Sequence, residues 1–178
     1  GNGSQWEGMG RGLLAEVPLF REAIEEIDSF FKPLTGYALV EELSGTLGSE
    51  RMQRTEYAQP ALFAVQVGIT SLLRHRGIVP VAVAGHSVGE VAASWAAGIL
   101  SLEEAVRVIV HRSHHQGSTR GMGQMTAVGV GQQAANALLL ELGLDKALVI
   151  AGVNSCKGIT VAGDPQQLDL LESCLAGR

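Results

Sequence analysis

One segment, residues 79–98, constrains the fold of this chain more than any other. It begins with the apolar run VPVAVA, which predicts a short buried strand, and the small residues from Glu90 onward predict a helix. Between them lies GHSVG, residues 85–89. A strand, a sharp turn and a helix in this order form a nucleophile elbow, with Ser87 at its apex. We expect a side chain at either Gly85 or Gly89 to crowd the neighbouring strand or helix.

The pentapeptide G-x-S-x-G by itself is weak evidence for a nucleophile. The chain contains 23 glycines in 178 residues, so such a pattern can arise by chance. The alternative is a serine that merely occupies a turn. The apolar run before the motif and the helical pattern after it favour the nucleophile.

Helical periodicity predicts the main elements around this elbow. One helix begins at Pro18 and is ended by Pro33 and Gly36, and a strongly amphipathic helix covers residues 58–76. A third helix is capped by Ser101 and runs to about residue 116. Residues 39–47 mix polar and apolar side chains and are expected to lead into a loop.

The pattern changes after the glycine-containing loop at residues 117–123. Strands are predicted at residues 124–130, 147–153 and 159–162, and helices at residues 132–142 and from Asp164 to about residue 175. This β-α-β-β-α order is a ferredoxin-like unit that lacks its final strand. The chain is therefore predicted to be α/β, with part of a large α/β subdomain in residues 1–120 and an incomplete ferredoxin-like subdomain in residues 121–178.

Arg112 is the most informative charged residue. It lies three residues after the last member of the inward stripe of its helix, which consists of Leu102, Ala105, Val106 and Ile109. An arginine on an inward face needs a partner. The partner is either a protein carboxylate, which the spacing alone favours, or a substrate carboxylate held by both arms of the guanidinium.

Two backbone amides are candidates for an oxyanion hole near the serine. The N–H of Val88 is the expected first donor, because it follows the nucleophile. Asn2 is the candidate for the second, because the glycines beside it let a backbone amide approach closely, although this stretch can equally be a plain turn into a helix. Gln59, at the start of its helix, either lines the pocket or is an ordinary helix-terminal residue.

None of the five histidines is a convincing general base. His86 stands too close to the serine in sequence to reach over it easily. His111 and His115 have the spacing of metal ligands, but no third ligand accompanies them, so no metal site is predicted. The other two, His75 and His114, are expected on the surface.

Charge and composition exclude several classes of function. The net charge of −5 argues against a general nucleic-acid-binding surface, and no apolar run is long enough to span a membrane. The two cysteines, Cys156 and Cys174, form no C-x-x-C motif, and the chain has no signal peptide, so we expect a cytoplasmic protein with reduced thiols. Both ends of the chain look trimmed, as in a fragment.

Five motifs, taken in order, resemble one family: GNGSQWEGMG, YAQPALFAVQ, GHSVGEVAA, the arginine of HRS, and AGVNS followed by TVAG. They are similar to the malonyl-CoA:acyl carrier protein transacylases and the acyltransferase domains of type I polyketide and fatty acid synthases. The resemblance covers essentially the whole chain. It implies an α/β-hydrolase-like large subdomain, present in part, with an inserted ferredoxin-like small subdomain that lacks its last strand.

The resemblance also implies roles for particular residues. Ser87 would be the acylated nucleophile, and the amides of Val88 and Asn2 would form the oxyanion hole. Arg112 would bind the free carboxylate of a malonyl-type group. Gln59 and His86 would belong to the substrate site, His86 as part of the GHS motif and not as the base.

The implied reaction needs no bound cofactor. A coenzyme A thioester would supply the acyl group, and the phosphopantetheine thiol of an acyl carrier protein would accept it. The partners would be this carrier protein and neighbouring domains of a megasynthase, with neither nucleic acid nor membrane involved. The valine after the serine and the run RTEYAQ at residues 54–59 resemble malonyl-selective members more than methylmalonyl-selective ones.

The chain departs from the family pattern in two ways. It opens with GNG where the family usually has GQG. The catalytic histidine of the family follows the small subdomain and lies outside this chain, so we expect the isolated fragment to be inactive. Two alternatives remain: an α/β-hydrolase-type esterase or thioesterase, which shares the elbow, and a truncated segment without catalytic activity of its own.

Overall fold

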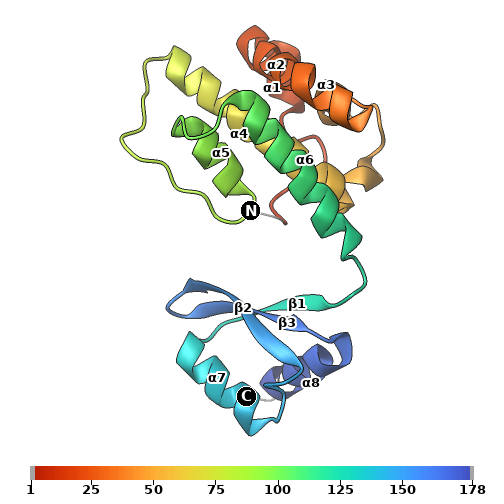
Figure 1. The fold of residues 1–178 in the computed structure, drawn as a ribbon, viewed down its shortest axis with the longest axis vertical. Coiled ribbons are helices and arrows are strands. Elements are labelled where there is room, and N and C mark those ends of the chain that lie inside the picture. Colours follow the sequence, from red (N-terminus) through yellow and green to blue (C-terminus); the bar gives the residue numbers. More distant parts are fainter. Residues whose placement is uncertain (1–2, 177–178) are drawn as a thin grey trace. The chain divides into compact units, whose positions relative to one another are not determined.

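The computed structural model describes residues 3–176. These residues form two compact units, unit 1 up to Ser118 and unit 2 from Thr119 onward (Figure 1). Unit 1 contains the helices α1 (Arg11–Glu16), α2 (Pro18–Thr35), α3 (Leu39–Ser44), α4 (Thr55–His75), α5 (Gly89–Ala96) and α6 (Leu102–Ser118), and the short 3-10 helix η1 (Ser49–Gln53). Unit 2 contains the strands β1 (Gln124–Val128), β2 (Leu148–Ser155) and β3 (Gly158–Gly163), and the helices α7 (Gln132–Glu141) and α8 (Pro165–Ala176). None of the helices in the described part of the chain is long and apolar enough to cross a membrane.

Helix α4 is the central element of unit 1. It contacts α2, α5 and α6, and these helices enclose one core. The largest side chains of this core are fully buried and come from α2, α3, α4 and α6: Phe20, Ile24, Ile27, Phe31, Leu39, Leu43, Phe63 and Ile109. The amphipathic stripes of the sequence therefore face one another, as their periodicity predicts.

Helix α2 begins at Pro18 as predicted but continues through Pro33. It ends at Thr35, where Gly36 adopts a left-handed conformation with φ of 79° and donates its N–H to the carbonyl of Lys32. Only one backbone donor is lost at Pro33, so the helix tolerates the proline in its last turn. Helix α4 likewise starts earlier than predicted, at Thr55, which places Pro60 in its second turn.

Helix α3 occupies residues for which the sequence predicts a lead into a loop. Its N-terminus is capped from another helix, because both carboxylate oxygens of Asp28 in α2 accept backbone N–H groups. The Asp28 Oδ1 to Leu39 N distance is 2.6 Å, and the Oδ2 to Val40 N distance is 3.0 Å. A cap that lies 11 residues upstream is invisible to any local pattern.

The capping role predicted for Ser101 is confirmed. Its hydroxyl accepts the N–H of Glu104, and the Glu104 carboxylate accepts the N–H of Ser101 in return. The two side chains form a capping box that fixes the start of α6. The direction of α6 then decides where Arg112 lies.

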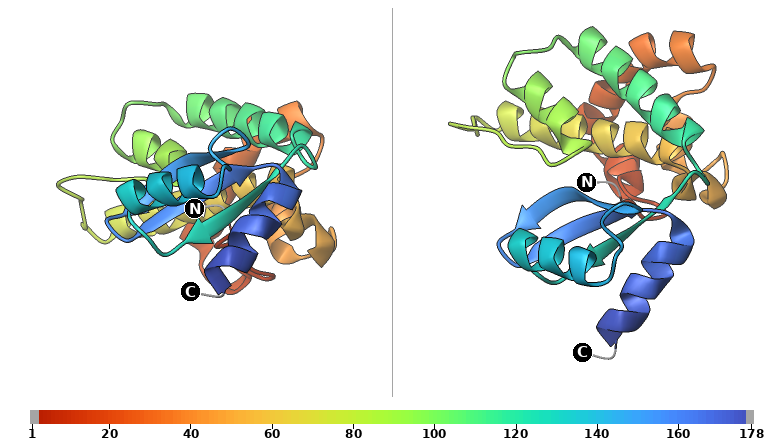
Figure 2. Two further views of the ribbon diagram at one scale, coloured as in Figure 1. Left: turned by 90° about the horizontal axis from the view of Figure 1, so that it is seen from below. Right: turned by 60° about the horizontal axis from the view of Figure 1, so that its bottom comes forward.

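The buried strand predicted before the elbow is absent. Residues 78–86 form an irregular segment that projects from the helices of unit 1 (Figures 1 and 2). The side chains of Val79 and Val81 are 74% and 106% exposed. A strand is stabilised by hydrogen bonds to a neighbouring strand, and no residue between 3 and 118 is in one. The apolar run therefore has no sheet to join among the described residues.

Unit 2 has the predicted β-α-β-β-α order of elements. Its sheet has the order β1-β3-β2, and both neighbouring pairs are antiparallel. Helices α7 and α8 lie on one face of the sheet (Figure 1), where a separate core joins them to the strands through Leu138, Leu148, Ile159, Val161, Leu168 and Leu171. Asp164 caps α8 as predicted, since its carboxylate accepts the N–H groups of Gln166 and Gln167.

Candidate active site

Ser87 has a backbone conformation that few residues other than glycine adopt. Its φ is 55°, and it is the one non-glycine residue with positive φ in the described part of the chain. This left-handed conformation costs about 1–2 kcal/mol for an ordinary residue. Ser87 stands between the irregular segment 78–86 and the first turn of α5, and its side chain is partly exposed. Strain of this kind is typical of functional sites.

The two glycines of the motif are not equivalent. A Cβ atom at Gly85 would lie 2.4 Å from the backbone nitrogen of Glu90 and 2.4 Å from the carbonyl group of Gly89. A Cβ atom at Gly89 would meet only the Gln66 amide nitrogen, at 3.8 Å, which is an ordinary contact. The prediction of crowding is confirmed for Gly85 and wrong for Gly89. The backbone of the turn is therefore closely packed where the chain enters it, at Gly85, and open where the chain leaves it, at Gly89.

Val88 anchors the elbow and leaves one backbone donor unused. Its side chain is fully buried in the core of unit 1. The next two amides are used within the turn, since Gly89 donates to the carbonyl of His86 and Glu90 to that of Ser87. The N–H of Val88 donates to no acceptor among residues 3–176. An N–H group at the start of a helix, beside the serine hydroxyl, is suited to stabilise a negative oxygen.

Arg112 lies directly beside the serine. Its Nη2 donates to Ser87 Oγ over 3.0 Å, although the two residues are 25 positions apart in the chain. Its Nη1 donates to the side-chain oxygen of Gln59 and, over 3.1 Å, to that of Gln116. Helix α6 supplies Arg112 and Gln116, and α4 supplies Gln59. The structure thus brings together Ser87, Arg112 and Gln59, three of the candidates from the sequence.

The partners of Arg112 are neutral. Within residues 3–176 the guanidinium forms no ion pair with a carboxylate, in contrast to Arg51, which pairs with Glu42 at 2.8 Å. The protein carboxylate that spacing alone favours as the partner of Arg112 is therefore not found there. Amide and hydroxyl oxygens accept hydrogen bonds from Nη1 and Nη2 without cancelling the positive charge of the guanidinium. The positive charge beside Ser87 remains available to an anionic ligand.

Gln59 is fully buried, and its amide is held in one orientation. Its Nε2 donates to Thr55 Oγ1 over 2.6 Å and to the side-chain oxygen of Gln116. Thr55 and Gln116 are not among the site residues predicted from the sequence. Thr55 is four positions from Gln59, and Gln116 is four positions from Arg112. Residues four apart lie on the same face of a helix, so this spacing is the signal that could have identified both.

The remaining candidates form no hydrogen bond with Ser87 Oγ or lie outside the described residues. Asn2 lies outside the described residues. His86 is exposed, and within residues 3–176 no histidine is hydrogen-bonded to Ser87 Oγ. The rings of His111 and His115 are stacked with centroids 6.4 Å apart. No group of residues that could hold a metal ion occurs in the described part of the chain.

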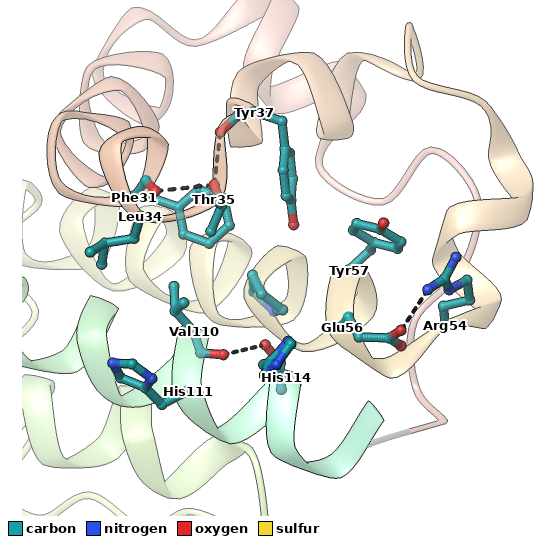
Figure 3. Close-up of a pocket in the computed structure, with 12 residues that line it drawn as sticks. Phe31, Leu34, Thr35, Tyr37, Arg54, Glu56, Tyr57, Val110, His111 and His114 are labelled. Atoms are coloured by element: carbon teal, nitrogen blue, oxygen red, sulfur yellow. Dashed lines mark hydrogen bonds and ion pairs between the residues drawn. The ribbon is translucent and has the colours of Figure 1, made fainter. Parts of the chain in front are cut away.

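A pocket of about 500 Å³ lies between α2, α4 and α6, and Ser87 is not part of its wall (Figure 3). Arg54 and Glu56 form an ion pair of 2.7 Å within it. Burial raises the pKa of the Tyr37 phenol on its wall, and the nearby Glu42 carboxylate adds to that effect. The lining residues are Phe31, Leu34, Thr35, Tyr37, Arg54, Glu56, Tyr57, Pro60, Val110, His111, Ser113 and His114. The hollow is separate from the cluster around the serine.

Comparisons with known proteins agree on one family. The family described as "Acyl transferase domain" matches residues 1–176. The chain is 38% identical over 175 residues to erythronolide synthase EryA3 of Saccharopolyspora erythraea, which covers 98% of the chain and 5% of that protein. It is 43% identical over 177 residues to highly reducing polyketide synthase 17 of Metarhizium anisopliae, which covers 95% of the chain and 6% of that protein.

Solved structures give the same result. A loading acyltransferase from the avermectin modular polyketide synthase matches with a TM-score of 0.90 and 32% identity, covering 100% of this chain and 57% of that one. The acyltransferase domain of the polyketide synthase PpsC of Mycobacterium tuberculosis matches with a TM-score of 0.87 and 33% identity, covering 99% and 52%. The chain therefore spans about half the length of these two acyltransferase chains and less than a tenth of the two synthases.

Proposed function

Because this chain belongs to the acyl transferase domain family, we propose that it moves an acyl group from a coenzyme A thioester to Ser87 and then to an acyl carrier protein. The resemblance to domains of polyketide synthases makes the carrier protein and the neighbouring domains of such a synthase the expected partners. Metal ions, bound cofactors, nucleic acid and membranes have no part in the proposal.

In the first half-reaction, Ser87 Oγ attacks the carbonyl carbon of the thioester. A bond forms between Oγ and that carbon, the bond from carbon to sulfur breaks, and coenzyme A leaves as a thiol with the proton of the serine. In the second half-reaction, the sulfur of the phosphopantetheine thiol forms a bond to the carbonyl carbon of the acyl-serine, the bond from that carbon to Oγ breaks, and Oγ takes up the proton of the thiol. The N–H of Val88, joined by that of Asn2, stabilises the oxyanion in both.

The acyl group that we propose is malonyl. The observation that carries this proposal is the contact between Arg112 Nη2 and Ser87 Oγ, 3.0 Å long, from a guanidinium without a carboxylate partner in residues 3–176. An acyl group attached to Ser87 can present its free carboxylate to the fork of Arg112. The buried Gln59 holds the other side of the guanidinium, and His86 belongs to the wall of the site. Val88 and the run at residues 54–59 support malonyl over methylmalonyl.

The general base is proposed to lie outside these 178 residues. In residues 3–176 no histidine reaches Ser87, and the chain spans only about half of the solved acyltransferase chains. A serine without a base is a weak nucleophile. We therefore expect the chain alone to be acylated very slowly, and imidazole added to the solution to accelerate the reaction by replacing the missing base.

We propose that the two units correspond to two subdomains whose boundary in the sequence is near residue 120. Unit 1 would be part of an α/β-hydrolase-like subdomain, and unit 2 a ferredoxin-like subdomain without its last strand. The antiparallel β1-β3-β2 order, with both helices on one face, supports the second assignment. Both cysteines are free and exposed, which supports a location in the reducing cytoplasm.

Mass spectrometry of the intact protein tests the proposed reaction. The chain is incubated with malonyl-CoA and imidazole, and we expect one malonyl group on the wild type and none on Ser87→Ala. Attachment that survives Ser87→Ala, or no attachment at any imidazole concentration, would contradict the proposal. In the presence of a carrier protein, hydrolysis faster than transfer would indicate an esterase or thioesterase instead.

The role of Arg112 is tested with two thioesters that differ in one carboxylate. Arg112→Ala should slow acylation by malonyl-CoA about a hundredfold, since a bidentate charged contact is lost, while acylation by acetyl-CoA changes little. An equal loss with both thioesters would show that Arg112 supports the structure and does not recognise the carboxylate.

A further inference from the structure

We propose that Gln116 is a positioning residue for carboxylate recognition: together with Gln59 it fixes the guanidinium of Arg112 against Ser87 while leaving its positive charge uncancelled. This proposal rests on the function proposed above. Gln116 is the third residue from the C-terminal end of α6 and lies on the same helical face as Arg112, one turn further along. Its side chain is exposed except where it meets the other two.

Arg112 determines which groups donate and which accept in this hydrogen-bond network. A guanidinium has only donors, so Gln59 and Gln116 must both turn their side-chain oxygens toward it. Both N–H groups of Nη1 are then used, one by each glutamine. The oxygen of Gln116 also accepts from the Gln59 nitrogen, and that nitrogen donates to Thr55. Each amide therefore holds the other, and the plane of the guanidinium has little freedom to rotate.

The N–H groups of Arg112 that the glutamines do not use are available to the substrate. Nη2 donates to Ser87 Oγ, which takes one of its two N–H groups. Nε of Arg112 donates to no acceptor in the described part of the chain. Nε and the remaining N–H of Nη2 can form the fork that binds both oxygens of a carboxylate. Without Gln116, Nη1 would have one acceptor fewer, and the guanidinium could turn this edge away from Ser87.

The neutrality of Gln116 is part of the proposal. A glutamate at this position would keep an acceptor oxygen toward both Arg112 and Gln59, so it would preserve the geometry. It would also pair with the guanidinium and compete with the substrate carboxylate for the same charge. The two roles of Gln116, geometric and electrostatic, can therefore be separated by two substitutions, Gln116→Ala and Gln116→Glu.

The experiment compares acylation by malonyl-CoA and by acetyl-CoA in the wild type, in Gln116→Ala and in Gln116→Glu, each with imidazole. We expect Gln116→Ala to lower the malonyl rate at subsaturating thioester about tenfold, which is the usual effect of losing one hydrogen bond to a charged group. Gln116→Glu should lower it at least as much. The acetyl rate should stay within about twofold in both variants. His115→Ala, an exposed neighbour outside the network, is the matched control and should leave both rates unchanged.

A second measurement does not depend on activity. In nitrogen NMR of the arginine side chains, Nη1 and Nη2 of Arg112 should give separate signals in the wild type, because rotation of the guanidinium is hindered. In Gln116→Ala the two signals should merge. Unchanged signals would overturn the positioning role, whatever the rates are.

The remaining outcomes separate this inference from the function on which it rests. Equal losses with malonyl-CoA and acetyl-CoA, or full malonyl activity in Gln116→Glu, would overturn the link to carboxylate recognition. A wild type that reacts with neither thioester would contradict the proposed function, and the NMR signals would still decide whether Gln116 positions Arg112.

Discussion

Replacing Gly85 with alanine should destabilise unit 1 and displace Ser87 from Arg112, whereas the same substitution at Gly89 should do neither. The difference lies in the surroundings of the new methyl group. At Gly85 it would stand 2.4 Å from backbone atoms of Gly89 and Glu90, and at Gly89 its nearest neighbour is a side-chain nitrogen at 3.8 Å. Backbone atoms at the start of a helix cannot move to relieve a close contact, whereas the end of a flexible side chain can.

The size of the effect follows from these distances. Ordinary van der Waals contacts begin at 3.4 Å, so the methyl group at Gly85 requires a shift of about 1 Å in the turn. Overpacking of this kind costs about 1–3 kcal/mol. The same shift would lengthen the Arg112 to Ser87 hydrogen bond from 3.0 Å to beyond the range of such bonds. Gly89→Ala, at the first position of α5, should be neutral or stabilise the protein by up to about 1 kcal/mol.

Tryptophan fluorescence during urea denaturation provides the assay. The chain has two tryptophans, Trp6 and Trp95, and both belong to unit 1, so the signal reports on this unit and not on unit 2. Trp95 is partly buried against the core, with the guanidinium of Arg74 over its ring at 4.9 Å. A loss of 2 kcal/mol should lower the urea midpoint of Gly85→Ala by roughly 1 M.

Acylation of Ser87 by malonyl-CoA in the same variants links the fold to the site. Misplacement of a reacting group by about 1 Å can cost about a hundredfold in rate. We expect a loss of this order for Gly85→Ala and wild-type behaviour for Gly89→Ala. The reasoning would be refuted by a Gly85→Ala protein with unchanged midpoint and rate, or by equal losses in both variants.

Two further substitutions test the strain at the elbow and the cap of α3. Ser87→Gly should be more stable than Ser87→Ala by about 1 kcal/mol in urea denaturation, because only glycine adopts the left-handed backbone without cost; equal stability would mean that Ser87 is not strained. Burial raises the pKa of Asp28 above 3.8, and its hydrogen bonds to Leu39 and Val40 offset this only in part. The folded protein thus binds that proton more tightly than the unfolded chain, so the contribution of Asp28 to stability is complete below pH 3.8 and is lost as the pH rises through the raised pKa. The urea midpoint of the wild type relative to Asp28→Asn should therefore fall as the pH rises from 3.8 through the raised pKa, and a constant difference would contradict this.

Features that depend on local spacing were predictable from the sequence. The inward position of Arg112 follows from its distance of three residues from Ile109, which is fully buried. The cap at Ser101 follows from the glutamate three residues later, and the elements of unit 2 follow from the alternation of apolar residues and turns. In each case the residues that decide the structure are neighbours in the chain.

Features that depend on distant partners were not predictable. Helix α3 is capped by Asp28 from another helix, and the apolar run before Ser87 has no neighbouring strand in the described residues. The choice between two kinds of partner for Arg112 could not be made from spacing. It depends on what surrounds the guanidinium in space, and there the structure shows Gln59 and Gln116 and no carboxylate within residues 3–176.

The neutral surroundings of Arg112 have a consequence for kinetics as a function of pH. Guanidinium groups stay charged in proteins, and the side chains of glutamine and threonine have no titrating group. A substrate carboxylate is ionised above about pH 5. Recognition of the carboxylate should therefore be constant over the whole neutral range. In a longer protein that also contains the base, a change in the acylation rate of Ser87 between about pH 6 and about pH 9 then reports the group that removes the serine proton, so the rate profile can give the pKa of that base before its identity is known.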